Sequence, residues 1–180
     1  PFQLNPELPA AGVDRQLYLR AKFVEPERVG AIQAALEESG RKEGIVFAFD
    51  RIGRVPNTLS AHRLMRFAAP FRKEEDLAER LFSAYFEQGR NIGDAEVLMA
   101  CAQESGLDTD AARAFLAGDA ERDTVAAADE LSRQGGISGV PYFIFDRRYA
   151  LAGAQEAAAF LPLFDALAAA GDAEMLASPA

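Results

Sequence analysis

Apolar residues at helical spacing dominate this chain. They predict a helix capped by Asp14 and ending at Phe23, and a second helix from Pro26 to about Arg41. From about 57 to 133 the spacing remains helical, which predicts about five helices in succession. An alanine-rich helix is predicted over 155–170, because alanine has the highest helix propensity.

Capping residues and glycines divide the long helical block into separate elements. An acceptor side chain at a helix start and a glycine at its end are the usual boundaries. The predicted helices are one capped by Asn57 or Thr58 and ending near Phe67, one containing Leu77 to Tyr85, one from Asp94 to Gly106, one from Asp108 to Leu116, and one from about Asp119 to Ser132.

Short apolar runs bounded by turn residues predict the strands. Residues 44–49 form a fully apolar run, typical of a buried strand. Residues 141–146 and 149–152 are joined by a short polar connection, which predicts a β-hairpin. With an extended segment at 1–4, the sequence predicts four strands and an α/β fold.

Composition and charge narrow the class of protein. With 180 residues, 49% of them hydrophobic, the chain is long enough for one domain with a large insertion. A net charge of -9 argues against a nucleic-acid partner, which needs a concentrated basic surface. No apolar stretch approaches the roughly 20 residues that cross a bilayer. We therefore expect a soluble, cytoplasmic protein without a membrane partner.

A proline stands at the entrance of the first hairpin strand, in the sequence Gly139-Val140-Pro141. Proline donates no hydrogen bond to a sheet, and only an X-Pro bond adopts the cis form at low cost. The preceding glycines permit a sharp turn that leaves backbone groups near Val140 and Pro141 uncovered. Such a loop would suit backbone pairing with an extended thiol or peptide substrate. The alternative is a simple transition from loop to strand.

The other residue types that carry chemistry are few. Cys101 is the single cysteine, which excludes an internal disulfide, and its apolar helical surroundings predict a buried and inert thiol. One histidine and no cysteine pair give no support for a metal site. The acidic residues near the last helix of the block are predicted to serve solubility and capping on a solvated face. They are Asp119, Glu121, Asp123, Asp129 and Glu130.

Three polar residues near one helix start are candidates for binding. Asn57 and Thr58 either cap the helix or present amide and hydroxyl groups to the same groove as Val140 and Pro141, and both roles are compatible. His62 is the only histidine, so chemistry that requires imidazole would depend on it. The alternative for His62 is a structural or solvated role.

The order of three motifs resembles one branch of a known family. They are Phe2-Gln3-Leu4-Asn5-Pro6, Pro56-Asn57-Thr58 with Ala61-His62-Arg63-Leu64, and Gly139-Val140-Pro141 with Gly153-Ala154-Gln155. Together they resemble the FrnE-type branch of the DsbA family, which is related to 2-hydroxychromene-2-carboxylate isomerase and to kappa-class glutathione transferases. The resemblance spans nearly all of the chain.

The resemblance implies a thioredoxin-like mixed sheet with a large α-helical insertion. Residues 1–56 and 134–180 would form the thioredoxin-like domain, and 57–133 the inserted helical subdomain. The pair Val140-Pro141 would be the cis-proline loop, which faces the redox dithiol and holds the substrate backbone. If the family's first strand and helix were missing, the sheet would have an open edge and exposed apolar surface, which predicts poor stability or pairing with another chain.

The family's Cys-x-x-Cys is missing from the sequence, which begins where the second strand of such a domain would lie. We expect the dithiol in a preceding N-terminal segment, which would give a thiol-disulfide oxidoreductase without a cofactor. The alternatives are a glutathione-dependent isomerase or transferase, with serine in place of the first cysteine, and a non-catalytic binding module. Expected partners are a thiol or disulfide protein or small molecule, and a second copy in a homodimer.

Overall fold

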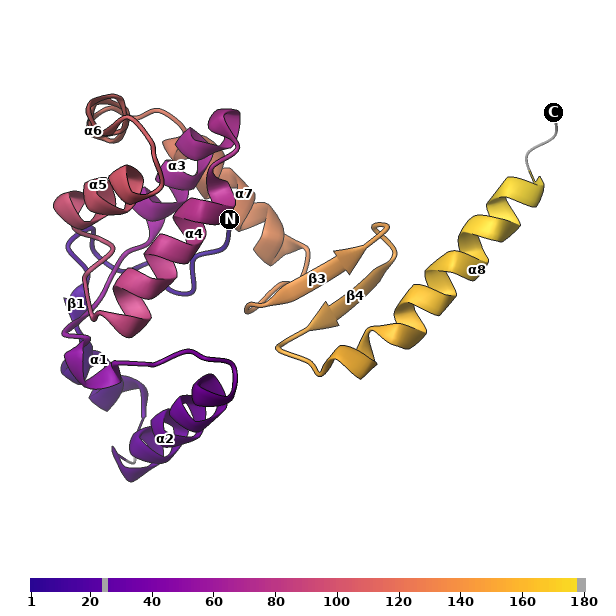
Figure 1. Cartoon of the computed structure of the whole chain (residues 1–180), viewed down its shortest axis with the longest axis horizontal. Helices are drawn as coiled ribbons and strands as arrows, with labels where there is room; N and C mark the ends of the chain where they lie inside the picture. The colour runs from indigo at the N-terminus through magenta and orange to yellow at the C-terminus, as the bar shows by residue number, and fades with distance from the viewer. Residues whose placement is uncertain (24–25, 178–180) are drawn as a thin grey trace. The chain divides into compact units, whose positions relative to one another are not determined.

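The computed structural model describes residues 1–23 and 26–177 of the chain (Figure 1). The chain divides into two compact units, one formed by Pro1 and Gln3–Asp129, the other by Phe2 and the residues from Glu130 onward. Each unit is described by itself below. The predicted domain boundaries at 56/57 and 133/134 stay a prediction.

Two helices open the first unit, both close to their predicted positions. Helix α1 spans Arg15–Lys22, and Asp14 caps it by accepting a hydrogen bond from the Leu17 N–H at 2.9 Å. Helix α2 spans Pro26–Lys42. A two-stranded antiparallel sheet joins β1 (Val13–Asp14) to β2 (Arg54–Val55). This pairing brings together the two ends of the segment that contains both helices.

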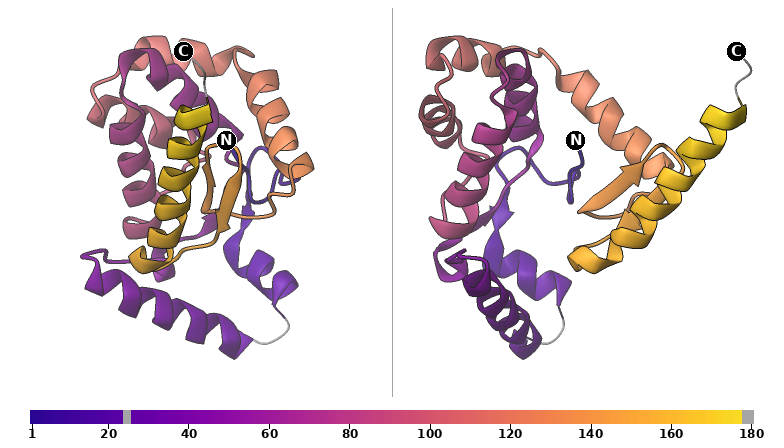
Figure 2. Two further views of the ribbon diagram at one scale, coloured as in Figure 1. Left: turned by 90° about the vertical axis from the view of Figure 1, so that its right-hand side faces the viewer. Right: turned by 45° about the vertical axis from the view of Figure 1, so that its right-hand side comes forward.

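The predicted helical block is confirmed as five α-helices. They are α3 (Leu59–Ala68), α4 (Glu74–Phe82), α5 (Ala95–Glu104), α6 (Thr109–Ala117) and α7 (Arg122–Gln134). A 3-10 turn, Ala69–Phe71, follows α3, and a π-helical turn, Ser83–Glu87, follows α4. Helices α3 to α6 pack against one another (Figures 1 and 2).

The core of the first unit lies between these helices. Its fully buried members include Leu64, Leu77 and Leu98, one from each of α3, α4 and α5. Asp94 and Asp108 cap α5 and α6 by accepting hydrogen bonds from backbone N–H groups, as their positions predict. The predicted helices that contain Leu77 and Leu98 therefore supply this core, whereas Ile32 and Leu36 on α2 are exposed.

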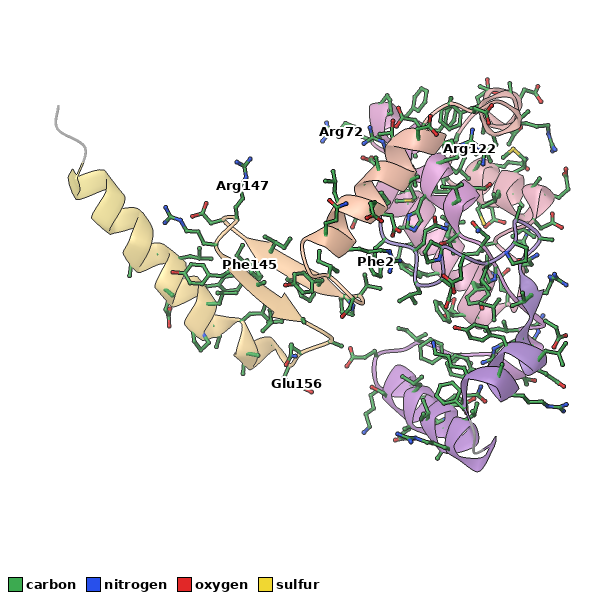
Figure 3. All side chains as sticks on the ribbon, turned by 180° about the vertical axis from the view of Figure 1, so that it is seen from behind. Phe2, Arg72, Arg122, Phe145, Arg147 and Glu156 are labelled. Atoms are coloured by element: carbon green, nitrogen blue, oxygen red, sulfur yellow. The ribbon has the colours of Figure 1, made fainter. Side chains whose placement is uncertain are left out.

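The second unit contains the predicted hairpin and a terminal helix. Strand β3 (Tyr142–Phe145) pairs antiparallel with β4 (Tyr149–Ala152). Helix α8 spans Leu161–Ala177 after a 3-10 turn at Ala157–Ala159, so it begins later than the predicted 155. The Phe145 ring faces α8 and lies 5.8 Å from the Phe164 ring, centroid to centroid (Figure 3).

Two of the four predicted strands are wrong: neither 1–4 nor 44–49 is a strand in the structure. A strand exists only where a neighbouring backbone accepts and donates its hydrogen bonds. The Gln3 N–H instead donates to a carboxylate, and Ile45 N–H donates back to the Gly40 carbonyl at 2.8 Å. Phe49–Arg51 then forms a 3-10 turn. The predicted burial of 44–49 is wrong as well, because Val46 is 70% exposed and Ile45 39% exposed.

Within residues 1–23 and 26–177, no helix is both long enough and apolar enough to span a membrane.

Candidate functional site

The Val140-Pro141 loop connects the end of α7 to β3 in the second unit. The peptide bond between the two residues is cis. The Pro141 carbonyl accepts a hydrogen bond from the Gly153 N–H at 2.8 Å, which ties the loop to the end of β4. Val140 is 52% exposed, and its N–H and C=O have no hydrogen-bond partner among the described residues. This backbone position is open to pairing with another extended chain.

Glycine at 136 determines where α7 ends. Gly136 has a φ of 84°, a region that favours glycine. Its N–H donates to the Arg133 carbonyl at 2.9 Å, and the Ile137 N–H donates to the Ser132 carbonyl at 3.1 Å. These bonds satisfy carbonyls that the helix would otherwise leave unpaired at its end. The glycine-rich approach therefore ends a helix immediately before the loop.

The side chain of Asn57 lies at the start of α3 and joins three segments of the first unit. Its Oδ1 accepts hydrogen bonds from the Leu59 N–H at 3.0 Å and from Gln3 Nε2 at 3.2 Å. Its Nδ2 donates to the Leu8 carbonyl at 2.7 Å. Asn57 thus satisfies a backbone N–H at the start of α3 from the position before the N-cap, and both atoms of its amide make hydrogen bonds. A direct contact of Asn57 with substrate stays a prediction.

Thr58 and His62 lie on the first turn of the same helix. Thr58 occupies the N-cap position without a capping hydrogen bond from its side chain, and its carbonyl accepts from the His62 N–H at 3.0 Å. Both side chains are half-buried. The structure thus brings Asn57, Thr58 and His62 together in the first unit, and Val140 and Pro141 together in the second. A functional role for any of them stays a prediction.

Arg63 is a buried cation that the sequence analysis did not single out. It is 1% exposed, and its guanidinium donates to the carbonyls of Phe115 at 3.0 Å, Leu116 at 3.2 Å and Ala120 at 2.8 Å. Burial lowers the pKa of this guanidinium, and the nearby charge of Arg122 lowers it further. Arg63 therefore caps the C-terminal end of α6, where carbonyls without an intrahelical donor favour a cation.

Asp129 corrects the prediction that the acidic residues share a solvated face. It is 5% exposed, and its Oδ1 accepts a hydrogen bond from the Gln3 N–H at 2.7 Å. Gln3 is itself only 5% exposed. The carboxylate therefore holds the N-terminal segment rather than contacting solvent. Asp119 and Glu121, by contrast, make partly exposed ion pairs with Arg122 and Arg66.

Cys101 is fully buried in the core, as predicted. Its Sγ donates to the Arg80 carbonyl at a distance of 3.8 Å, and burial raises the pKa of the thiol. A protonated, inaccessible thiol is a poor nucleophile. Because it is the single cysteine, the 180 residues contain no dithiol. Within the part of the chain that the structure describes, no cluster of His, Cys, Asp or Glu side chains could hold a metal ion.

Three comparisons with known proteins found matches to this chain. The model of the DSBA-like thioredoxin domain matches residues 1–164. The crystal structure of a probable DsbA oxidoreductase from Streptomyces coelicolor superimposes with a TM-score of 0.82 at 30% identity, covering 90% of this chain and 70% of that chain. The uncharacterized protein YwbO of Bacillus subtilis (strain 168) is 28% identical over 148 residues, covering 80% of this chain and 68% of YwbO.

These matches establish the fold class and confirm the resemblance to the DsbA family. The fold is the α/β thioredoxin-like fold with a helical insertion, even though the sheets of this chain are small. The matched range contains the Val140-Pro141 loop as well as the whole helical block. The chain belongs to the DSBA-like thioredoxin domain family.

Proposed function

We propose that this chain forms the substrate-binding loop and the helical part of a FrnE-like thiol-disulfide oxidoreductase, whose redox dithiol belongs to a segment preceding these residues. The match of the DSBA-like model over residues 1–164 carries the proposal. The Streptomyces coelicolor relative, described as a probable DsbA oxidoreductase, supports an oxidoreductase-type function.

Thiol-disulfide exchange needs two reactive thiols, which Cys101 does not supply. A thiolate attacks one sulfur of a disulfide, the S–S bond breaks, and the other sulfur leaves as a thiolate. A second thiolate then resolves the mixed disulfide, so that the dithiol is oxidised and the substrate reduced, or the reverse. Cys101 is alone, buried and protonated, and it supplies neither thiolate.

The Val140-Pro141 loop is the proposed contact for the substrate backbone. The free N–H and C=O of Val140 support this role, because an extended substrate can pair with both. Thr58, whose hydroxyl caps no backbone N–H, is a second proposed contact, and His62 a third. Asn57 would act indirectly, because its hydrogen bond to the Leu59 N–H positions the start of α3. The proposed substrate is a thiol or disulfide protein or small molecule, in the cytoplasm, with no cofactor.

Catalysis of insulin disulfide reduction tests this proposal. We expect the 180-residue chain to be inactive and the longest polypeptide that its gene encodes to be active. Substitution of either cysteine of the dithiol by serine should abolish turnover, whereas Cys101→Ser should not affect it. Activity of the 180-residue chain that is lost in Cys101→Ser would overturn the proposal. Activity that requires glutathione and a serine would favour the isomerase or transferase instead.

A further inference from the structure

A series of three hydrogen bonds connects α7, the N-terminal segment and α3 within the first unit. The Gln3 N–H donates to Asp129 Oδ1 at 2.7 Å, and Gln3 Nε2 donates to Asn57 Oδ1 at 3.2 Å. The same Asn57 oxygen accepts the Leu59 N–H at 3.0 Å. We call Asp129, Gln3 and Asn57 the Gln3 network. Its two long-range bonds join positions 126 and 54 residues apart in sequence, so neither belongs to local helix or turn structure.

The Gln3 network is buried, although stability alone does not require polar groups there. Gln3 and Asp129 are each 5% exposed. Buried polar groups lose their hydration, and apolar groups of the same shape in place of a hydrogen-bonded pair are often as stable. Among the described residues, no buried side-chain nitrogen or oxygen atom lacks a hydrogen-bond partner. A buried network with every member satisfied holds its side chains in one geometry.

The geometry that the Gln3 network holds is that of the backbone at Thr58. The Asn57 side chain is fixed through both atoms of its amide, because its Oδ1 accepts the Leu59 N–H and its Nδ2 donates to the Leu8 carbonyl. Asn57 and Leu59 flank Thr58, so their hydrogen bond closes a turn around it, with φ −95° and ψ 5°. The Thr58 carbonyl then accepts the His62 N–H at 3.0 Å, in the first turn of α3.

We propose that Gln3 and Asp129 are positioning residues, which act through Asn57 to hold Thr58 and His62 in place for substrate binding. The inference rests on the proposed function in taking Thr58 and His62 as substrate contacts. Gln3 and Asp129 offer almost no surface to a substrate, so their effect reaches it through Asn57. Loss of the network should therefore weaken substrate binding and leave the chemical step, which belongs to the dithiol, unchanged.

Hydrogen exchange in the 180-residue chain tests the positioning without any enzymatic activity. Gln3→Met keeps the length of the side chain and removes the donor to Asn57 Oδ1. We expect the Leu59 amide to exchange about fivefold faster relative to the Leu98 amide in α5, the factor that corresponds to one hydrogen bond. Gly89→Ala is the control for general stability and should leave this ratio unchanged. The same ratio in Gln3→Met as in the unsubstituted chain would overturn the proposal.

The kinetics of insulin reduction by the longest polypeptide that the gene encodes test the role in substrate binding. Gln3→Met should raise KM about fivefold and leave kcat unchanged, because it disturbs substrate contacts and not the thiols. Gly89→Ala should change neither constant. An unchanged KM in Gln3→Met, or a loss in kcat alone, would show a purely structural network and overturn the proposal. Absence of activity in the unsubstituted polypeptide, with faster Leu59 exchange in Gln3→Met, would contradict the proposed function and support the positioning of Thr58.

Discussion

At the scale of single residues, the buried polar groups were the hardest to predict. Arg63 lies at an apolar position of α3, yet its hydrogen-bond acceptors lie more than fifty residues later in the chain. Asp129 is satisfied by the N–H of Gln3, 126 positions away. A sequence pattern indicates which face of a helix is buried, but not which distant group will pair with a charge on that face.

Arg63→Met should destabilise the first unit strongly. The substitution leaves carbonyls at the end of α6 without donors in a buried site, which costs on the order of 3 kcal/mol. Urea unfolding of the 180-residue chain measures the loss. Arg66→Met is the control on the same helix, because Arg66 is 51% exposed and pairs with Glu121 at the surface. Its expected cost is below about 1 kcal/mol, and equal costs for the two variants would contradict the assigned role of Arg63.

The buried thiol of Cys101 should make the folded protein less stable at alkaline pH. Burial raises the folded-state pKa of the thiol above its unfolded value. The contribution to stability is therefore fully present below the unfolded pKa and is lost as the pH rises through the folded pKa. In Cys101→Ala the free energy of unfolding should fall less steeply from neutral to alkaline pH. Parallel curves for the two proteins would show that the thiol is not buried as described.

At the scale of elements, local signals predicted the helices and the hairpin. Caps such as Asp14, Asp94 and Asp108 act within one turn, and a hairpin pairs neighbours in sequence. The segments 1–4 and 44–49 are different, because a strand there depends on a partner that is remote in sequence. Neither segment finds such a partner among the described residues, so both strand predictions are wrong.

Gly89 is predicted to be essential for the turn after the π-helical segment. Its φ is 69°, and an added Cβ would lie 2.6 Å from the Arg51 carbonyl oxygen. Gly89→Ala should therefore destabilise the first unit by about 1–3 kcal/mol, measured by urea unfolding. Gly53→Ala is the control, because nothing lies within 4 Å of a Cβ there. A Gly89→Ala variant as stable as the control would show that the two segments do not approach so closely.

At the scale of the whole molecule, the order of motifs predicted the family correctly. The family match includes both the helical block and the loop at Val140 and Pro141. The candidate site residues are described in two separate units, with Asn57, Thr58 and His62 in one and Val140 and Pro141 in the other, and their common role stays a prediction. The missing chemical group, the dithiol, is the point on which the functional account depends.

The intact mass of the purified protein, with thiols counted under denaturing conditions before and after reduction, tests this point most directly. The account predicts a mass well above 19.4 kDa and two thiols in addition to Cys101 after reduction. A mass of 19.4 kDa with a single thiol would contradict it, because no dithiol would then be present for exchange.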